Sequence, residues 1–336
     1  MDPVTQGIVA TTAAQAYSKK HNLIIISFIG FLAGLAPDID IFIRSDADPL
    51  LFLEYHRQFT HSLFFIPIGS LICAVTFYYV FAKKFNFSFK ETYIYSTIGY
   101  ATHGIIDSFT TYGTQLLWPF TDERFAWNTV SVIDPLFTIP VIILCAWTLI
   151  KNNKIYTFYA IIWMLIYQLT GFVQKDRAED IIYEYAKLKG HDINEIEAKP
   201  SFANIIVWKV IYSDDSSYYV NAIRLGLSHK IYPGEMIKKL DIKKDFKWLE
   251  PSSQQAIDVE RFRWFSNDYL GIAKHNQNII YDIRFSSIPN EVEGLWGIQL
   301  DKNKGKDEHI TYVTNRGKSI NRSYDLIRMI TDQYVD

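Results

Sequence analysis

The sequence predicts a membrane all-α half with about five to six transmembrane helices, followed by a soluble α+β C-terminal domain. Uncharged apolar runs follow one another through the first half of the 336 residues, and the two longest could each cross a bilayer as a helix. From Lys175 onward charged residues return, and short strand-like stretches alternate with helical ones. The chain therefore divides into a transmembrane domain (residues 1–174), a helical connector (175–199) and a soluble extracytoplasmic α+β domain (200–336).

Each predicted membrane helix depends on a run with few or no formal charges. The predicted helices cover residues 3–18, 22–37, 61–82, 92–120, 135–150 and 155–174. The first is a milder segment that spans or re-enters the membrane, and the fourth contains one formal charge, Asp107, together with His103. The alternative is the core of a large soluble helical protein, which would have to bury several such runs without lipid.

The last domain shows weaker but recognisable patterns. Alternating and β-branched stretches predict strands near residues 203–212, 217–225, 269–272 and 279–285, and helical stretches lie near 175–189, 254–265 and 321–335.

Lysine clusters predict the orientation in the membrane. Alternating helices place three clusters on one side, which the positive-inside rule assigns to the cytoplasm. These clusters are Lys19 with Lys20, Lys83 and Lys84 with Lys90, and Lys151 with Lys154. The loops 38–60 and 112–131, and everything after residue 174, then face outward.

Composition excludes several classes of function. The net charge of −2 leaves no basic surplus for nucleic-acid binding. Cys73 and Cys145 lie inside apolar runs and show neither a disulfide framework nor a zinc spacing. The chain contains no G-x-S-x-G element, no P-loop and no dinucleotide fingerprint.

Five polar clusters interrupt the membrane half, and alternating helices bring all of them to one membrane face. They are Asp2 with Gln6, Asp38 with Asp40, His56 with Arg57 and His61, His103 with Asp107, and Asp134. His103 and Asp107 are spaced i, i+4, so they share a helix face about 13 Å or less from its end. Ionisable groups at such depth are costly and usually functional, although a structural hydrogen bond between helices is the alternative.

The remaining clusters each have a structural alternative. Asp38 and Asp40 could simply end a membrane helix at the water interface. Thr60 could be the N-cap of the next helix, which would place His61 in the first turn. Asp134 before Pro135 is a strong helix start, with Asp as N-cap and Pro at the first helical position.

Imidazole and carboxylate ligands together suit Zn²⁺, Mn²⁺ or Fe²⁺ better than Ca²⁺ or Mg²⁺, and we expect Zn²⁺ first and Mn²⁺ second. The candidate ligands are Asp38, His56, His61, His103 and Asp107. They exceed one tetrahedral site, so either two metals bind or some residues orient the ligands. Metal-activated water is the economical mechanism. Asp40 or Asp134 would act as general base or orienting group, and Arg57 would bind a phosphate oxygen unless it is an exposed juxtamembrane cation.

Four elements carry a resemblance to a known family. They are the opening Met-Asp-Pro-x-Thr-Gln-Gly, Pro37-Asp38-Ile39-Asp40, His56-Arg57-x-x-Thr60-His61-Ser62 and His103-x-x-x-Asp107. In this order they resemble the LexA-regulated, inner-membrane-associated metal-dependent hydrolases of bacteria, over about residues 1–175. The resemblance implies an inner-membrane, multi-pass protein in which Asp38, Asp40, His61, His103 and Asp107 are metal ligands or their partners. It also implies similarity to zinc-dependent phospholipase C and related nucleases, hence phosphoester hydrolysis. Many members have His at the position of Gln6, a poor zinc ligand.

The sequence leaves three functions open. The first is a hydrolase acting on a membrane lipid or lipid-linked phosphoester. The second is a metal- or proton-coupled transporter, whose polar residues should lie at the bilayer midplane on broken helices. The third is a non-catalytic scaffold with a structural metal, whose C-terminal domain binds a protein partner of unknown identity; full coordination by protein ligands would favour it.

Overall fold

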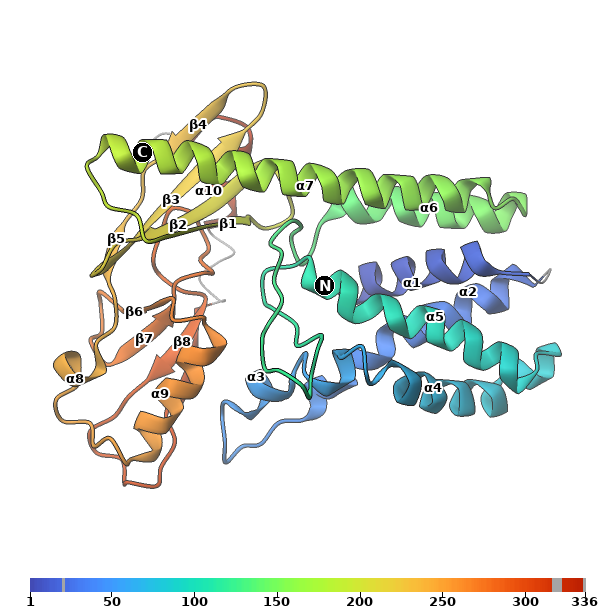
Figure 1. The fold of residues 1–336 in the computed structure, drawn as a ribbon, viewed down its shortest axis with the longest axis horizontal. Helices are drawn as coiled ribbons and strands as arrows, with labels where there is room; N and C mark the ends of the chain where they lie inside the picture. Colours follow the sequence, from blue (N-terminus) through green and yellow to red (C-terminus); the bar gives the residue numbers. More distant parts are fainter. Residues whose placement is uncertain (20–21, 316–321, 335–336) are drawn as a thin grey trace. The chain divides into compact units, whose positions relative to one another are not determined.

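A computed structural model describes residues 1–19, 22–315 and 322–334 (Figure 1). The chain forms two compact units, a helical unit and a sheet unit. The helical unit comprises Met1–Phe42, Tyr55–Val173 and Phe202–Ile205, and the sheet unit comprises Ile43–Glu54, Gln174–Ser201 and Ile206–Asp336. A helical N-terminal part followed by a C-terminal sheet domain is thus confirmed, with residues 43–54 added to the latter.

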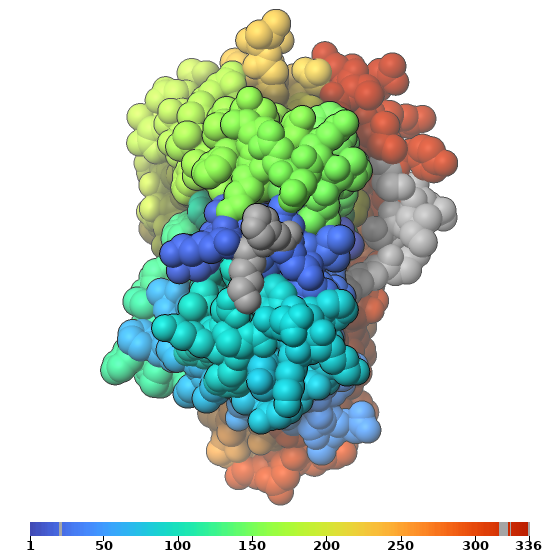
Figure 2. Space-filling model, turned by 90° about the vertical axis from the view of Figure 1, so that its right-hand side faces the viewer, coloured from blue at the N-terminus to red at the C-terminus, as the bar shows by residue number. Residues whose placement is uncertain are grey.

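The helical unit contains six longer helices and three short ones among its described residues. The longer helices are α1 (Pro3–Tyr17), α2 (Leu23–Leu35), α4 (Ile66–Val80), α5 (Phe89–Ser108), α6 (Pro135–Lys151) and the first half of α7 (Ile155–Leu188). The short ones are η1 (Ala36–Phe42), η2 (Phe59–His61) and η3 (Ala82–Phe85). Another short helix, α3 (Leu51–Tyr55), belongs to the sheet unit up to Glu54. In Figure 2, α1 and α2 (blue) lie between α4 and α5 (cyan) on one side and α6 and α7 (green) on the other.

Local signals set the starts of several helices. Asp2 caps α1 by accepting hydrogen bonds from the backbone amides of Val4 and Thr5. The predicted start at Asp134 is confirmed, because its side chain accepts from Leu136 N and Phe137 N while Pro135 occupies the first turn. Gly99 of α5 allows this helix to pack closely against α2. A side chain there would not fit, because its Cβ would lie 2.5 Å from the carbonyl oxygen of Gly30 in α2.

Apolar side chains cover the outer faces of this unit. Ile68, Ile72 and Val75 of α4 are exposed, as are Leu165 and Leu169 of α7. Such continuous apolar exposure is unusual for a protein surrounded by water and fits contact with lipid.

The number of candidate membrane-spanning helices among the described residues is lower than predicted. Among the described residues, two helices are long and apolar enough to cross a bilayer: Leu23–Phe42 and Ile155–Leu188. A third span results only if Leu51–His61 and Ile66–Val80, which are bent by 84°, count as one. The expectation of five to six spans is not supported. The 15 residues of α1 and the 17 of α6 give helices of about 22 and 26 Å, shorter than the hydrocarbon core of about 30 Å.

Two of the predicted helices have different ends. The expected helix at 61–82 begins only at Ile66, with Phe65 at the N-cap position and no side-chain cap, so the proposed N-cap role of Thr60 was wrong. The expected helix at 92–120 ends at Ser108. The irregular segment that follows folds back on itself through a bridge between Thr114 and Phe125.

The sheet unit contains two antiparallel sheets. The first has the order β1 (Glu195–Pro200), β2 (Val207–Ser213), β3 (Ser217–Leu225) and β4 (His229–Tyr232), with β5 (Met236–Lys238) also paired to β3. The second has the order β6 (Leu270–Ile272), β7 (Ile279–Asp282), β8 (Trp296–Gln299) and β9 (Thr311–Thr314). Besides most of α3, the described helices of this unit are α8 (Ile242–Asp245), α9 (Gln254–Phe265), α10 (Ser323–Ile330) and the second half of α7.

Most of the predicted elements of this unit occur near their expected positions. The strand at 217–225 and the helix at 254–265 have the predicted bounds. The strand predicted at 203–212 starts later, at Val207. Residue 20 of the first lysine cluster and the ends of the helix predicted at 321–335 lie outside the described residues. Residues 175–188 of the predicted connector form the second half of α7, which continues without a break from the apolar run before it, and residues 195–199 belong to β1.

Candidate metal centre

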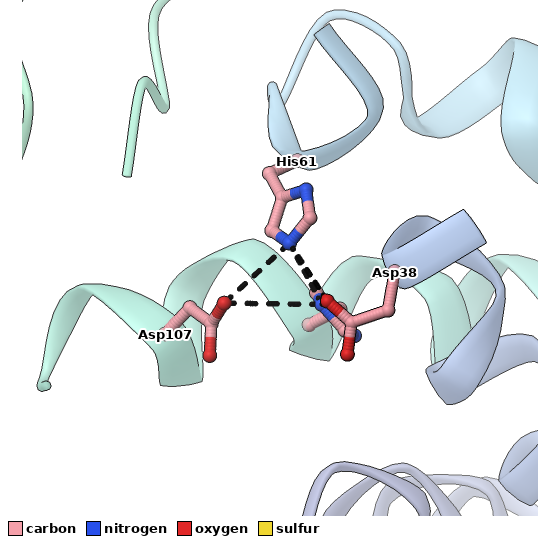
Figure 3. A group of neighbouring side chains, drawn as sticks. Asp38, His61 and Asp107 are labelled. Atoms are coloured by element: carbon pink, nitrogen blue, oxygen red, sulfur yellow. Dashed lines mark hydrogen bonds and ion pairs between the residues drawn. The ribbon is translucent and has the colours of Figure 1, made fainter. Parts of the chain in front are cut away.

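Four ionisable side chains from three elements meet inside the helical unit. Asp38 comes from η1, His61 from η2, and His103 and Asp107 from successive turns of α5. Each offers one ligand atom, and the four atoms lie within 4.8 Å of one another. Figure 3 shows Asp38, His61 and Asp107 pointing toward a common point.

The spacing of these atoms matches the edges of a small coordination polyhedron. His61 Nε2 lies 2.9 Å from His103 Nε2, 3.5 Å from Asp38 Oδ1 and 3.4 Å from Asp107 Oδ2. His103 Nε2 lies 3.3 Å from Asp38 Oδ1 and 3.9 Å from Asp107 Oδ2. Zinc bonds to N and O of about 2.0–2.1 Å place tetrahedral ligand atoms roughly 3.3 Å apart. The four side chains therefore fit a divalent ion of that size.

The two imidazole rings are held so that their Nε2 atoms face the centre. His103 Nδ1 lies 2.6 Å from the carbonyl oxygen of Gly34, which can only accept, so Nδ1 carries the hydrogen. His61 Nδ1 lies 3.2 Å from the Asp40 carboxylate. Neutral rings in this orientation direct two Nε2 lone pairs at each other across 2.9 Å. A cation between them relieves that repulsion, and carboxylate or carbonyl partners on the far nitrogen are typical of metal-bound histidine.

The side chain of Asp107, like those of His61 and His103, is fully buried. Its Oδ1 accepts hydrogen bonds from Gln6 Nε2 at 2.6 Å and from the α-amino group of Met1. Its Oδ2 lies 3.1 Å from Arg57 Nε but accepts no well-formed hydrogen bond among the described residues. A buried carboxylate oxygen that accepts no hydrogen bond lowers stability, and binding a metal ion would supply the missing partner.

A second, overlapping group lies on the more open side. It consists of Asp38, Asp40 and His56. His56 Nδ1 lies 2.8 Å from Asp40 Oδ1, while Asp40 Oδ2 accepts from Thr60 Oγ1 at 2.7 Å and from the Arg57 amide at 3.0 Å. The side chains of His56 and Asp38 are 32% and 23% exposed, whereas those of Asp40, His61, His103 and Asp107 are buried. The centre is therefore most accessible to solvent past His56 and Asp38.

Backbone features bring these elements close enough to meet. Gly104 of α5 faces η2, and a Cβ there would lie 2.2 Å from the carbonyl oxygen of His61. Tyr100, one turn earlier, donates to the carbonyl oxygen of Thr60 at 2.8 Å. Arg57 adopts a positive φ of 67°, which turns the chain between His56 and η2.

The structure brings six of the predicted site residues into two overlapping groups and leaves Arg57 and Asp134 outside them. Asp38, His61, His103 and Asp107 form one group, and Asp40 connects His61 to His56 in the other. Arg57 is not the exposed juxtamembrane cation considered as an alternative. Arg57 is 4% exposed. Its guanidinium forms an ion pair with Asp107, donates a hydrogen bond to Thr110 Oγ1 and lies over the Tyr112 ring.

Asp134 lies in neither group. Its carboxylate caps α6 and accepts a hydrogen bond from the Tyr167 hydroxyl at 2.7 Å. Sequence reasoning missed Tyr100 and Thr110. The position of Tyr100 three residues before His103, on the same side of a helix, was the signal available for it.

Comparison with known proteins gives two curated relatives. "Inner membrane protein YbcI" of Escherichia coli (strain K12) is 29% identical over 109 residues, 31% of this chain and 61% of that protein. "Uncharacterized protein YfhP" of Bacillus subtilis (strain 168) is 25% identical over 205 residues, 60% of this chain and 59% of that protein. The chain thus spans about three fifths of the length of each relative. No solved structure matches it.

A family model matches the part of the chain that contains the polar centre. That model is described as "YdjM inner membrane protein" and covers residues 1–178, which include all the residues of both groups. The match takes in slightly more than half of the 336 residues. The chain therefore belongs to the YdjM inner membrane protein family.

Proposed function

We propose that the protein is a membrane-bound, metal-dependent hydrolase that cleaves phosphoesters of lipids or lipid-linked molecules. The observation that carries this proposal is the convergence of Asp38 Oδ1, His61 Nε2, His103 Nε2 and Asp107 Oδ2 beside a more exposed His–Asp pair. A divalent cation held by these atoms, Zn²⁺ or Mn²⁺, would supply Lewis acidity that acidifies water and polarises a phosphoryl oxygen.

The chain's own residues supply the proton chemistry. Asp40 accepts from His56 Nδ1, which leaves His56 Nε2 free to accept a proton on the solvent-facing side. Thr60 and the Arg57 amide fix the other oxygen of Asp40. We therefore assign proton transfer to His56 and its orientation to Asp40, instead of a general-base role for Asp40 itself. Asp134 takes no part, because the helix start and Tyr167 occupy its carboxylate.

Arg57 acts on the ligand set instead of on the substrate. Its guanidinium is buried against Asp107. There its positive charge offsets the negative charge of the Asp107 carboxylate, which shares the centre with two other carboxylates. The role of phosphate binding, expected from the sequence, would require an exposed guanidinium. We propose that Arg57 sets the charge of the centre and keeps the Asp107 carboxylate in place.

Partial exposure favours catalysis over a purely structural metal. Structural sites are closed by protein ligands, whereas a catalytic site keeps a coordination position for water or substrate. Four protein ligands would fill a tetrahedral site, so catalysis requires that the ion accept water as a fifth ligand on the side where Asp38 and His56 are partly exposed. The apolar outer faces of α4 and α7 place the centre in a lipid-bound protein, which favours a lipid or lipid-linked substrate. The positive-inside rule, applied to the lysine clusters, supports an extracytoplasmic position for the sheet unit, which is part of this proposal.

One observation favours a second candidate, metal- or proton-coupled transport. The bent pair Leu51–His61 and Ile66–Val80 breaks by 84° next to a metal ligand, and broken helices are characteristic of transporter binding sites. A transporter would carry the ion across sealed vesicles without hydrolysing an ester, so the two functions are separable by assay.

The experiment that tests the proposal measures metal and hydrolysis together. The protein would be purified in detergent without chelators, loaded with Zn²⁺ or Mn²⁺, and compared with His61→Ala, His103→Ala and the control His229→Ala, which removes an exposed histidine on β4. We expect near-stoichiometric metal in wild type and control, loss in both site variants, and hydrolysis of a phosphodiester lipid in vesicles only where metal is retained. Absence of metal from the loaded wild type would refute the proposal. Metal with ion uptake into vesicles and no hydrolysis would replace it by transport.

A further inference from the structure

A cavity of about 620 Å³ lies in the sheet unit and shares no lining residue with the metal centre. It is bounded by α8, the segment that follows it and α9 (Figure 1). The apolar lining residues are Ile242, Phe246, Leu249, Pro251, Ala256 and Ile257. This volume falls within the usual range of small-molecule sites, about 300–1,000 Å³, which are also mostly apolar.

The charged residues of the cavity leave a positive surplus. Arg261 is engaged by Asp48, Glu54 and Asp258. Glu260 lies 3.2 Å from Arg263 Nε and is likewise paired.

Two lysines at the rim remain. Lys243 and Lys247 are exposed, and neither forms an ion pair within the described ranges 1–19, 22–315 and 322–334. The rim therefore offers two uncompensated ammonium groups next to an apolar interior.

The position of Ile257 supports a ligand in this cavity. It lies on α9, whose other face packs into the core through Val259 and Phe262, both fully buried. Ile257 points the opposite way and is 49% exposed. Together with the apolar walls it forms a surface that water solvates poorly and that an alkyl chain would cover.

We propose that this cavity binds a single-chain anionic amphiphile, with its alkyl chain on the apolar walls and its carboxylate or phosphate head between Lys243 and Lys247. Apolar lining alone would accept any alkyl chain, and the lysines alone would attract any anion. The combination selects molecules that carry both. The site is independent of the metal centre and of the hydrolase proposal.

Photolabelling in a lipid bilayer tests the proposal on the full chain. The protein would be placed in phosphatidylcholine nanodiscs, because detergent would compete for the cavity. The probes would be dodecanoate, dodecyl phosphate and dodecanol, each carrying a diazirine near the end of the alkyl chain. Labelled peptides would be mapped by mass spectrometry, with unlabelled dodecanoate as competitor.

The variants separate the two parts of the proposal. Lys243→Glu with Lys247→Glu reverses the rim charge, and Ile257→Glu places a carboxylate on the apolar wall. Lys244→Glu is the matched control, since Lys244 is exposed on the same helix but pairs with Asp241 and does not line the cavity.

We expect saturable labelling of residues 242–261 by both anionic probes in wild type and control. The double variant should weaken it on the order of tenfold, the effect of losing two exposed charge pairs and adding repulsion. Ile257→Glu should abolish it. A head-group preference between dodecanoate and dodecyl phosphate identifies the natural class. Equal labelling by dodecanol, unchanged labelling in the variants, or no competable labelling of 242–261 would each overturn the proposal.

Discussion

Replacing Asp40 by Asn tests whether the hydrogen bonds around the ligands determine metal affinity. Asp40 Oδ2 accepts hydrogen bonds from Thr60 Oγ1 at 2.7 Å and from the Arg57 amide at 3.0 Å, and it lies 3.2 Å from His61 Nδ1. The other oxygen, Oδ1, is paired with His56 Nδ1. Asparagine keeps one oxygen but places an NH₂ donor where another donor already lies. Either His56 or the group around His61 then loses its acceptor.

The expected loss is about 10- to 100-fold in metal affinity, the range for removing a partner of a metal-bound histidine. The assay is competition for Zn²⁺ against a chromophoric chelator at fixed pH, with purified protein in detergent. Asp46→Asn is the matched control, since Asp46 is an exposed carboxylate between η1 and α3. Wild-type affinity in Asp40→Asn, with the fold intact by circular dichroism, would refute the role of Asp40 in orienting His61.

Three further predictions concern packing, an ion network and pH. Gly104→Ala should lower the free energy of unfolding by about 1–3 kcal/mol and weaken metal binding, because the new Cβ would lie 2.2 Å from the backbone of η2. The control Gly226→Ala should do neither, since its Cβ would have no neighbour closer than 3.5 Å. Thermal melts measure the stability of both variants, and Zn²⁺ competition measures their metal affinity. Arg261→Ala should speed amide hydrogen exchange in residues 43–54, since Arg261 holds two carboxylates of that segment; unchanged exchange would contradict this. Burial lowers the pKa of Lys209 to about 7, below its value in the unfolded chain. Between about pH 7 and 10 the unfolded chain therefore binds more protons than the folded one. The free energy of unfolding of the sheet unit should rise with pH in this range, by at most about 1.4 kcal/mol per pH unit. Lys209→Met should flatten that rise, as measured by chemical unfolding at several pH values.

Helical periodicity explains why much of the metal centre could be predicted. His103 and Asp107 are one turn apart in an uninterrupted helix, so their side chains necessarily share a face. Asp38 follows the end of an apolar run, and His61 precedes the next. A simple alternation of helices was enough to bring these four residues to one place.

The same reasoning failed where the chain departs from a regular helix. The run 61–82 looks continuous, but the chain bends by 84° before α4 because Pro67 favours a first-turn position and the preceding residues form a separate 3₁₀ turn. Counting uncharged residues therefore overestimated the number of spans. Helix length, not composition alone, sets what can cross a bilayer.

Contacts between distant segments were also out of reach. Nothing in the local sequence shows that Arg57 turns inward to Asp107, or that Gln6 donates to the same carboxylate. These depend on how α1, α5 and the turn before η2 pack together. Family membership confirms the inner-membrane part of the resemblance, while LexA regulation and hydrolysis stay predictions.

X-ray absorption at the zinc edge of the loaded protein tests the central claim most directly. The account predicts a first shell of nitrogen and oxygen only, at about 2.0–2.1 Å, with outer-shell scattering from two imidazole rings, whereas His103→Ala should retain no zinc. A sulfur ligand, a shell without imidazole scattering, or an unchanged spectrum in His103→Ala would show that the metal binds elsewhere and that the four converging side chains are not its site.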